Sequence, residues 1–411
     1  MSFLMPAGRN SNMKICYIGS VFPRSDDDTE VPWLRKTVKL LIEKGYDITV
    51  FVPSFRGLKS HTVEGIKVKR FRYFPSKWED LTGEEGGPNK IHKLRYKIIT
   101  VFYLLSGSIQ LALLHSREKF DILHIHWPFP HGILSTFATL FCKSKVILNY
   151  HGACLLLAHR YPFVRRFLHY FTKCADAVIV NSSFTGKQVT DIYKRDIHVI
   201  PYGTTVEPKS PEHKPGTSRR IFSVGRMIER KGFRYLIDAM PEVLKQFPDA
   251  TLTIAGGGPV REELIKQIEL LHLQESVFLS GKVSADELER LFSQADMFVL
   301  PAIVDKNGDT EGLGVVLIEA MTYKMPVIAT NVGGIPDVII PGVSGILVEQ
   351  KNPSMLAGEI IGLLNDPQKM QLIGDQGYSF ILKQFSWDRV IGQISDLYSS
   401  VYLNGKDALQ S

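Results

Sequence analysis

Residues 13–52 read MKICYIGSVFPRSDDDTEVPWLRKTVKLLIEKGYDITVFV. The run from Met13 to Gly19 is short, apolar and ends in glycine, which is typical of a buried parallel strand. A helix is expected from about Val31 to Glu43, and a second apolar run follows at residues 46–52. This order of strand, helix and strand predicts a βαβ unit, the repeating element of a doubly wound parallel sheet.

The same alternation continues to about residue 200 and starts again near residue 220. Further strands are expected at residues 66–72, 121–126, 145–149, 177–181 and 197–200, and then at 220–225, 250–255, 277–280, 297–300, 326–329 and 345–348. Between the two sets, residues 206–218 hold three prolines and a glycine among charged residues, which indicates a linker. The sequence therefore predicts two Rossmann-like α/β domains, 1–205 and 219–386, followed by an amphipathic final helix, 387–411. Open sheets of this kind bind ligands beyond the carboxyl ends of their strands.

The composition is that of a globular protein. Of the 411 residues, 44% are hydrophobic and 22% charged, which excludes a disordered, collagen-like or multi-span membrane chain. Four cysteines without a CxxC pair indicate reduced thiols and a cytoplasmic location, and residues 1–12 lack the apolar core of a signal peptide. The apolar stretch from Ile98 to Leu114 is interpreted as a core helix packed on a sheet, with an interfacial membrane contact as the alternative.

The net charge of +7 is unevenly distributed, because residues 1–200 carry a balance of +13 and the remainder a balance of −6. Four basic residues, Lys67, Lys69, Arg70 and Arg72, lie close together in the basic half, which also holds Arg165 and Arg166. We expect peripheral association with an anionic membrane surface through this half, and a merely solvated face is the alternative. Nucleic acid is not favoured as a partner, because no recognition motif accompanies the charge.

The sharpest candidate site lies between Asp309 and Met321, DTEGLGVVLIEAM. Gly312 and Gly314 allow the backbone to approach a ligand closely before a helix begins, and free N–H groups at a helix start favour a phosphate. Glu311 and Glu319 are eight residues apart, slightly over two helical turns, and are therefore expected on one helix face. They could hold hydroxyl groups of two parts of one ligand. The alternative is a capped helix with a glutamate near its positive dipole end.

A second candidate is the segment from Gly225 to Gly232, GRMIERKG, which follows an expected strand. Arg226 comes directly after the strand, and Lys231 lies at the start of a helix. Two cations beside helix N–H groups could hold a diphosphate. Ordinary surface cations are the alternative.

Several residues of the first half lie at expected strand ends. The loop from Gly19 to Pro23 could hold a phosphate or an acceptor, or be a structural turn. His151 follows a strand and is a candidate for contact with a polar substrate. His124 and His126 alternate on one strand, but no matching cysteine or acidic cluster supports a metal site there.

Two further patterns are rejected. Residues 305–309, DKNGD, imitate the start of a calcium loop, but the sixth position is Thr310 and the twelfth is Val316. The run from Gly256 to Pro259 lacks the G-x-G-x-x-G spacing of a dinucleotide site.

Taken together, these segments resemble the retaining GT-B fold glycosyltransferases of glycosyltransferase family four, also called group 1 glycosyltransferases. The resemblance covers most of the chain and is strongest from Ser223 to about Gly345. It is carried by the ordered segments SVGR at 223–226 with Lys231-Gly232, AGGGP at 255–259, the Glu311–Glu319 segment, VGGIPD at 332–337 and GVSG at 342–345.

The resemblance implies the site residues. Arg226 and Lys231 would neutralise the donor diphosphate, Glu311 would contact the transferred sugar, and Glu319 would hold the ribose. His151 matches the family's amino-domain histidine near the sugar, so that His151, Arg226, Lys231 and Glu311 form the expected catalytic set. The other expected donor-binding residues are Gly19, Gly256, Gly281, Lys282, Val283, Gly312, Leu313 and Gly314. The final helix would pack on the first domain.

The expected activity is therefore a retaining hexosyl transfer from a nucleotide-diphosphate sugar to a hydroxyl of a glycan or lipid-linked acceptor. A UDP-sugar is favoured, with a GDP-sugar as the alternative, and the expected role is cell-envelope or exopolysaccharide biosynthesis. No metal or cofactor is expected, because fixed cations and helix N–H groups could stabilise the departing diphosphate. The alternatives are a nucleotide-sugar epimerase of the same architecture and an inactive carbohydrate- or nucleotide-binding module. The protein is expected in the cytoplasm, at the inner face of the membrane if it associates with one.

Overall fold

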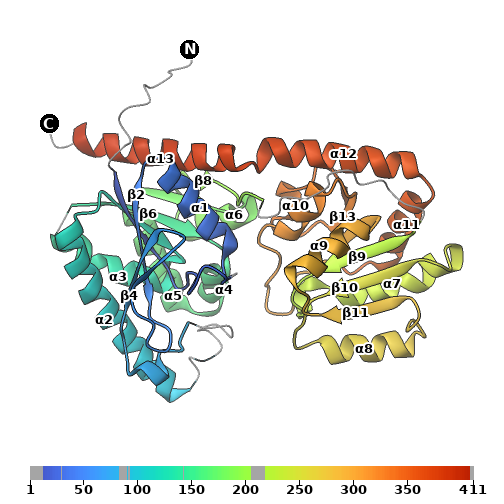
Figure 1. The fold of residues 1–411 in the computed structure, drawn as a ribbon, viewed down its shortest axis with the longest axis horizontal. Helices are drawn as coiled ribbons and strands as arrows, with labels where there is room; N and C mark the ends of the chain where they lie inside the picture. Colours follow the sequence, from blue (N-terminus) through green and yellow to red (C-terminus); the bar gives the residue numbers. More distant parts are fainter. Residues whose placement is uncertain are drawn as a thin grey trace, which may run out of the picture. The chain divides into compact units, whose positions relative to one another are not determined.

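The computed structural model describes residues 13–28, 30–82, 90, 93–141, 143–204 and 218–407. The chain divides into two compact units (Figure 1). The first unit comprises the chain up to Asn181, then Thr185–Ile200, and finally the residues from Val390 on; the second comprises Ser182–Phe184 and Pro201–Arg389. Residues 206–217 of the expected linker lie outside the described residues, as do residues 1–12.

The first unit alternates strands and helices as the sequence pattern predicts. Its elements are β1 (Lys14–Ile18), α1 (Pro32–Glu43), β2 (Asp47–Pro53), β3 (His61–Val63), β4 (Ile66–Phe71), η1 (Ser76–Trp78), α2 (Leu94–Glu118), β5 (Ile122–His126), α3 (Pro128–Phe141), β6 (Lys145–Tyr150), α4 (Ala153–Arg160), α5 (Pro162–Cys174), β7 (Ala177–Val180), α6 (Ser183–Ile192) and β8 (His198–Val199). Their sheet has the order β3-β4-β2-β1-β5-β6-β7-β8. Every pair is parallel except β3 with β4.

The two faces of the first sheet have different cores, because successive side chains of a strand point to opposite faces. On β5, Leu123 and Ile125 belong to an apolar core that includes side chains of α2, α3 and α5. His124 lies between them in the sequence and meets the hydroxyl of Tyr398, from the last helix, at 2.7 Å. Tyr17 of β1 meets the same hydroxyl, also at 2.7 Å. A strand of a doubly wound sheet is covered on both faces, so these polar groups are buried.

The second unit repeats the pattern with a six-stranded sheet of order β11-β10-β9-β12-β13-β14. All of its strand pairs are parallel. Its elements are β9 (Arg220–Val224), η3 (Glu229–Lys231), α7 (Phe233–Gln246), β10 (Thr251–Ala255), α8 (Arg261–Leu270), β11 (Val277–Gly281), α9 (Ala285–Gln294), β12 (Met297–Leu300), α10 (Val315–Thr322), β13 (Val327–Thr330), η4 (Ile335–Asp337), β14 (Ile346–Val348), α11 (Pro353–Leu364), α12 (Pro367–Gln384) and the start of α13 (Trp387–Asp407).

The fold class is confirmed: both units are doubly wound parallel α/β layers. The last helix, α13, begins in the second unit, and its residues from Val390 on belong to the first. There Ser395 lies 2.5 Å from the hydroxyl of Tyr46. The helix α13 thus supplies polar partners to the first sheet.

The basic residues at positions 67–72, expected to meet a membrane, differ in their exposure. Arg70 is buried and donates hydrogen bonds to the carbonyls of Phe22 and Pro23, both at 2.8 Å. Arg72 pairs with Glu79 at 2.7 Å. Arg70 is therefore excluded from the expected membrane-binding surface, since an arginine that serves buried acceptors cannot also face lipid. The side chains of Lys67 and Arg72 are 59% and 48% exposed.

Candidate functional site

The carboxyl edge of the second sheet gathers most of the expected donor-binding segments. Three backbone hydrogen bonds tie the loops that follow β9, β10 and β11: Gly225 N to Ala255 O at 3.0 Å, Met227 N to Gly257 O at 2.8 Å, and Gly256 N to Gly281 O at 2.7 Å. Lys282 and Val283 follow directly on Gly281. Segments far apart in the sequence thus lie at one sheet edge, where ligands of α/β proteins bind.

Lys231 is held in place by the glycine that follows it. Gly232 adopts a φ of +65°, and a Cβ built on it would lie 1.9 Å from the carbonyl oxygen of Pro301, at the end of β12. Any other residue would clash there. On the same side, Ile303 N donates to Arg230 O at 2.8 Å. The short helix η3 is therefore pressed against the end of β12, and its two cations are fixed in direction.

Those two cations converge on Glu311. The Nζ of Lys231 lies 2.5 Å from a Glu311 carboxylate oxygen, and Nη1 of Arg230 lies 3.3 Å from the same oxygen. Arg230 also reaches Asp309, at 3.3 Å from its Nε. Lys231 is buried, and the side chains of Arg230 and Glu311 are 21% and 13% exposed. Lys231 and Glu311, expected to contact the donor diphosphate and the transferred sugar, are thus in direct contact with each other.

The electrostatics keep Glu311 ionised. Burial alone would raise the pKa of its carboxyl, but the charges of Lys231 and Arg230 outweigh burial, and the net pKa lies below its ordinary value. Burial instead raises the pKa of Asp309, against the opposing effect of Arg230. A charged Glu311 can accept hydrogen bonds from hydroxyl groups or stabilise a nearby positive charge. It is unsuited to donate a proton at neutral pH.

Glu311 lies before a helix and not within it. The helix α10 begins at Val315, with Gly314 as its N-cap at a φ of +88°. The expectation that Glu311 and Glu319 share a helix face through two turns is therefore wrong, because only Glu319 is helical. Glu319 is half-buried in α10. Gly312, Leu313 and Gly314 lead from Glu311 into the first turn, whose N–H groups lack acceptors within the helix.

The Glu311 backbone is also braced from β13. Gly334 N donates to Glu311 O at 2.9 Å. A Cβ on Gly333, which has a φ of +57°, would lie 2.0 Å from that same carbonyl oxygen. These two glycines belong to the VGGIPD segment of the sequence. Their role is to let two loops touch through their backbones.

Arg226 and Arg230 lie in one segment but have different surroundings. Arg226 is exposed in the loop after β9, where it can reach a ligand in solution. Arg230, which was quoted within its segment but given no role, contacts Thr310, Glu311 and Asp309. The sequence does show that Arg230 is next to Lys231. This could have predicted the contact with Glu311, because consecutive residues of a tight turn can both point at one group.

The first unit has its own cluster at the carboxyl edge of its sheet. His151 follows β6, and its Nε2 lies 2.9 Å from Nδ1 of His126. The rings of Trp33 and Trp127 each lie 4.9 Å from the ring of His151, centroid to centroid. A Cβ on Gly19 would lie 3.3 Å from the Trp127 ring. The expected residues Gly19 and His151 therefore lie in one cluster, together with two tryptophans that the sequence analysis did not single out.

The histidines of this cluster are neutral. Burial lowers the pKa of His151 to about 3, helped by His124, and burial alone lowers the pKa of His124 to about 3. Burial and the neighbouring histidines hold the pKa of His126 well below its ordinary value. Neutral His126 and His151 can share one proton between their facing nitrogens. Within the described ranges, no group of three or more His, Cys, Asp or Glu side chains is placed to hold a metal ion.

Two doubly wound units with ligand-binding edges of this kind define an α/β enzyme of the GT-B class. The family described as "Glycosyl transferases group 1" matches residues 207–380, and "Glycosyltransferase Family 4" matches residues 33–207. The chain belongs to the group 1 glycosyltransferases of family four, and it is a hexosyltransferase.

Named relatives agree with this assignment. A glycosyltransferase of Methanocaldococcus jannaschii is 26% identical over 88% of this chain and 99% of its own. The Mycobacterium tuberculosis GDP-mannose-dependent alpha-(1-6)-phosphatidylinositol monomannoside mannosyltransferase is 27% identical over 68% of this chain and 74% of its own.

Among solved structures, sucrose-phosphate synthase from Thermosynechococcus elongatus superposes with a TM-score of 0.76 at 20% identity, covering 95% of this chain and all of that one. The Anabaena protein HepE, solved with UDP and glucose, superposes with a TM-score of 0.70 at 18% identity, covering 94% of this chain and all of that one. These structures show the GT-B fold of the chain.

Proposed function

We propose that this enzyme transfers a hexosyl group from a nucleotide-diphosphate sugar to a hydroxyl of a glycan or lipid-linked acceptor, with retention at the anomeric carbon. The observation that carries the proposal is the ionised, largely buried Glu311, held by Lys231 and Arg230 at the start of α10. A fixed negative charge suits the positive charge that develops on a sugar as its leaving group departs.

The leaving diphosphate gains negative charge as the bond from the anomeric carbon to the phosphate oxygen breaks. Exposed Arg226, the ammonium of Lys231 and the first N–H groups of α10 are the groups of the second unit suited to stabilise it. The acceptor oxygen then bonds to the anomeric carbon on the same face, and its proton passes to the departing phosphate oxygen. No metal is required for this charge balance, since protein cations supply it.

The remaining donor contacts are those that the resemblance to the family implies. Glu319 would hold the ribose hydroxyls, and the segment from Gly281 to Val283 would lie beside the nucleobase. The glycine-rich backbone at Gly256 and the Gly312–Gly314 turn would face phosphate and sugar. A UDP-sugar is our first candidate donor. A GDP-sugar is the second, since a mycobacterial relative is named as GDP-mannose-dependent.

The cluster around His151 suits an acceptor or donor sugar on the side of the first unit. Trp33 and Trp127 are half-buried and frame the imidazole, so they offer apolar faces beside a polar group. Carbohydrate rings present apolar C–H faces as well as hydroxyl groups, and such a frame can bind both. We further propose a role in cell-envelope or exopolysaccharide biosynthesis, at the cytoplasmic side of the membrane.

The test is a panel of UDP- and GDP-sugars, with binding followed by calorimetry and turnover followed as acceptor-dependent nucleotide release. Glu311→Gln should lower kcat by a factor of about 10²–10³, as for loss of one preorganised electrostatic group. Glu229→Gln is the matched control, because Glu229 is exposed in the same short helix η3 as Lys231. NMR of the product should show the anomeric configuration of the donor.

Two results would reject the proposal. Epimerised donor formed without any acceptor would indicate an epimerase. Unchanged turnover of the folded Glu311→Gln variant would remove Glu311 from the chemistry.

A further inference from the structure

The helix α2 exposes a continuous row of large apolar side chains. Six of them define what we call the α2 stripe: Leu94, Ile98, Val101, Leu105, Ile109 and Leu113. Their exposed fractions run from 49% to 74%. Spacings of three or four residues place them on one helix face, over a length of about 28 Å at 1.5 Å per residue. Soluble proteins rarely leave so long an apolar row in water.

The opposite face of α2 is apolar too, and it is buried. Tyr96, Ile99, Tyr103 and Leu111 belong to the apolar core beneath the first sheet. The helix is therefore apolar almost all round, and an 18-residue window within it reaches a mean hydropathy of 1.7. Such helices belong inside a large core or in contact with lipid. The sequence expectation of a core helix is thus correct for only one of its faces.

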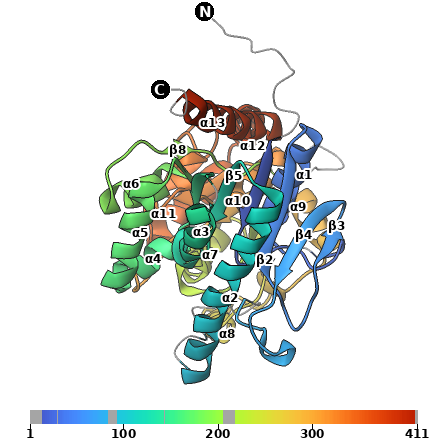
Figure 2. The ribbon, with the colours of Figure 1, turned by 90° about the vertical axis from the view of Figure 1, so that its left-hand side faces the viewer.

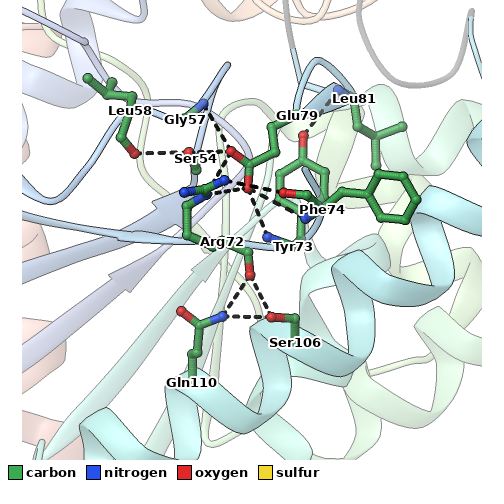
Figure 3. A network of polar contacts seen from close by, with 10 residues as sticks. All are labelled: Ser54, Gly57, Leu58, Arg72, Tyr73, Phe74, Glu79, Leu81, Ser106 and Gln110. Atoms are coloured by element: carbon green, nitrogen blue, oxygen red, sulfur yellow. Dashed lines mark hydrogen bonds and ion pairs between the residues drawn. The ribbon is translucent and has the colours of Figure 1, made fainter. Parts of the chain in front are cut away.

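Polar contacts fix which face of α2 points outward (Figure 3). Ser106 and Gln110 donate to the carbonyl oxygen of Arg72, at 2.5 Å and 2.8 Å. The Arg72 side chain is held by Glu79, which is fully buried and also accepts from Ser54 Oγ at 2.8 Å. Because these contacts tie α2 to the residue that follows β4, α2 cannot roll its stripe inward without losing them.

The position of α2 in the first unit leaves the stripe accessible. Figure 2 shows α2 across the side of the first unit that faces the viewer, with α3 behind it. The extensive packing of α2 on α3 agrees with this view. Because its inner face is packed on protein, α2 can touch a bilayer by lying in the interface plane, and it cannot cross the bilayer without unfolding the unit.

Charges at both ends of α2 indicate what covers the stripe. Lys93, Arg95 and Lys97 are exposed at its start, and Arg117 and Lys119 are exposed at its end. A second copy packed stripe to stripe would bring these like charges together in either orientation. On an anionic lipid surface, the basic residues would instead bind lipid phosphates. The stripe would be buried at the boundary between headgroups and acyl chains.

We propose that α2 is a membrane-docking helix, which binds an anionic bilayer surface with its stripe buried in the headgroup region and its basic ends on lipid phosphates. The proposal is independent of the transfer reaction, because no residue of the stripe belongs to either ligand-binding edge. It places the membrane contact expected for the basic first half on residues 93–119.

The test is co-sedimentation of the full-length protein with vesicles of phosphatidylcholine alone or mixed with phosphatidylglycerol. We expect binding to the anionic vesicles at low salt and release by high salt or alkaline carbonate. The double variant Leu105→Glu/Ile109→Glu should lower the bound fraction at least about tenfold. Leu270→Glu is the matched control, because Leu270 is 79% exposed on α8 of the second unit and should bind like the parent.

Several outcomes would overturn the proposal. These are no binding to anionic vesicles at low salt, unchanged binding of the double variant, or carbonate-resistant insertion, which would indicate a spanning helix. A lipid-free dimer that the double variant converts to a monomer would show that a second copy covers the stripe. Circular dichroism and turnover of a water-soluble acceptor, both unchanged in the double variant, separate this test from the proposed function.

Discussion

Acidification should destabilise the first unit through its buried histidines. A group whose folded pKa is depressed contributes stability that is complete above its unfolded pKa and is lost as the pH falls through the window between the two values. Burial lowers the pKa of His124 and His151 to about 3 and that of His131 to about 4, from an ordinary value of 6.5. The relevant window is therefore the interval from 6.5 downward, where the unfolded chain binds protons that the folded chain excludes.

The magnitude follows from these three values. Between about pH 7.5 and about pH 5, each such histidine costs the folded state about 2 kcal/mol, and the three together cost about 6 kcal/mol. His126 adds a cost of the same sign. A total of this size is comparable with the usual stability of a whole domain, about 5–15 kcal/mol. We therefore expect the first unit to unfold in mild acid.

The assay is urea unfolding at the two pH values, followed by tryptophan fluorescence. Trp33, Trp78 and Trp127, three of the four tryptophans, belong to the first unit, so the signal reports mainly on it. His124→Asn should reduce the pH-dependent loss by about 2 kcal/mol. The same variant measured at about pH 7.5 isolates its packing cost. Equal unfolding free energies of the parent at both pH values, or a full pH dependence in the variant, would refute the reasoning.

Three further predictions concern the second unit and the loop below α2. Arg226→Ala should weaken nucleotide-diphosphate binding by about 1.5–3 kcal/mol, the usual worth of a hydrogen bond to a charged group; an unchanged affinity in calorimetry would contradict the diphosphate contact. Gly333→Ala should abolish most turnover while circular dichroism stays unchanged, because its Cβ would lie 2.0 Å from the Glu311 carbonyl oxygen. Full activity of this variant would show that the close contact between the two loop backbones is dispensable. Glu79→Ala should lower the free energy of unfolding by about 3–5 kcal/mol, since Ser54 and the backbone N–H groups of Gly57 and Tyr73 lose a buried carboxylate acceptor. A loss below about 1 kcal/mol in urea titration would contradict a structural role of Glu79.

The strands could be predicted from the sequence because each is a short apolar run ended by glycine or a polar residue. The strand β3, residues His61–Val63, was missed because three residues carry no periodic signal. It pairs with β4 only after the chain reverses at Gly65, which has a φ of +81°. Such pairing depends on a partner strand and not on the residues of β3 themselves.

The spacing of glycines and charged residues along the chain predicted which segments form the candidate site, but not which side chains contact one another there. Glycines next to charged residues marked Lys231 and Glu311, which do meet. Arg230 could not be ranked above Arg226, because which of two neighbouring arginines turns inward depends on the packing of η3 against β12. The burial of His124 depends likewise on Tyr398, a partner 274 residues away. Hydropathy alone also could not decide which face of α2 remains uncovered.

The dependence of the first sheet on α13 affects the order in which the chain can mature on the ribosome. Tyr17, Tyr46 and His124 emerge early, yet their partners Ser395 and Tyr398 are made 274 to 381 residues later. Domains usually fold as they are synthesised, the amino-terminal one first. Here the first unit cannot close its polar core until α13 has been made. Truncation shortly before residue 390 should therefore yield a product whose first unit remains incompletely folded and binds chaperones.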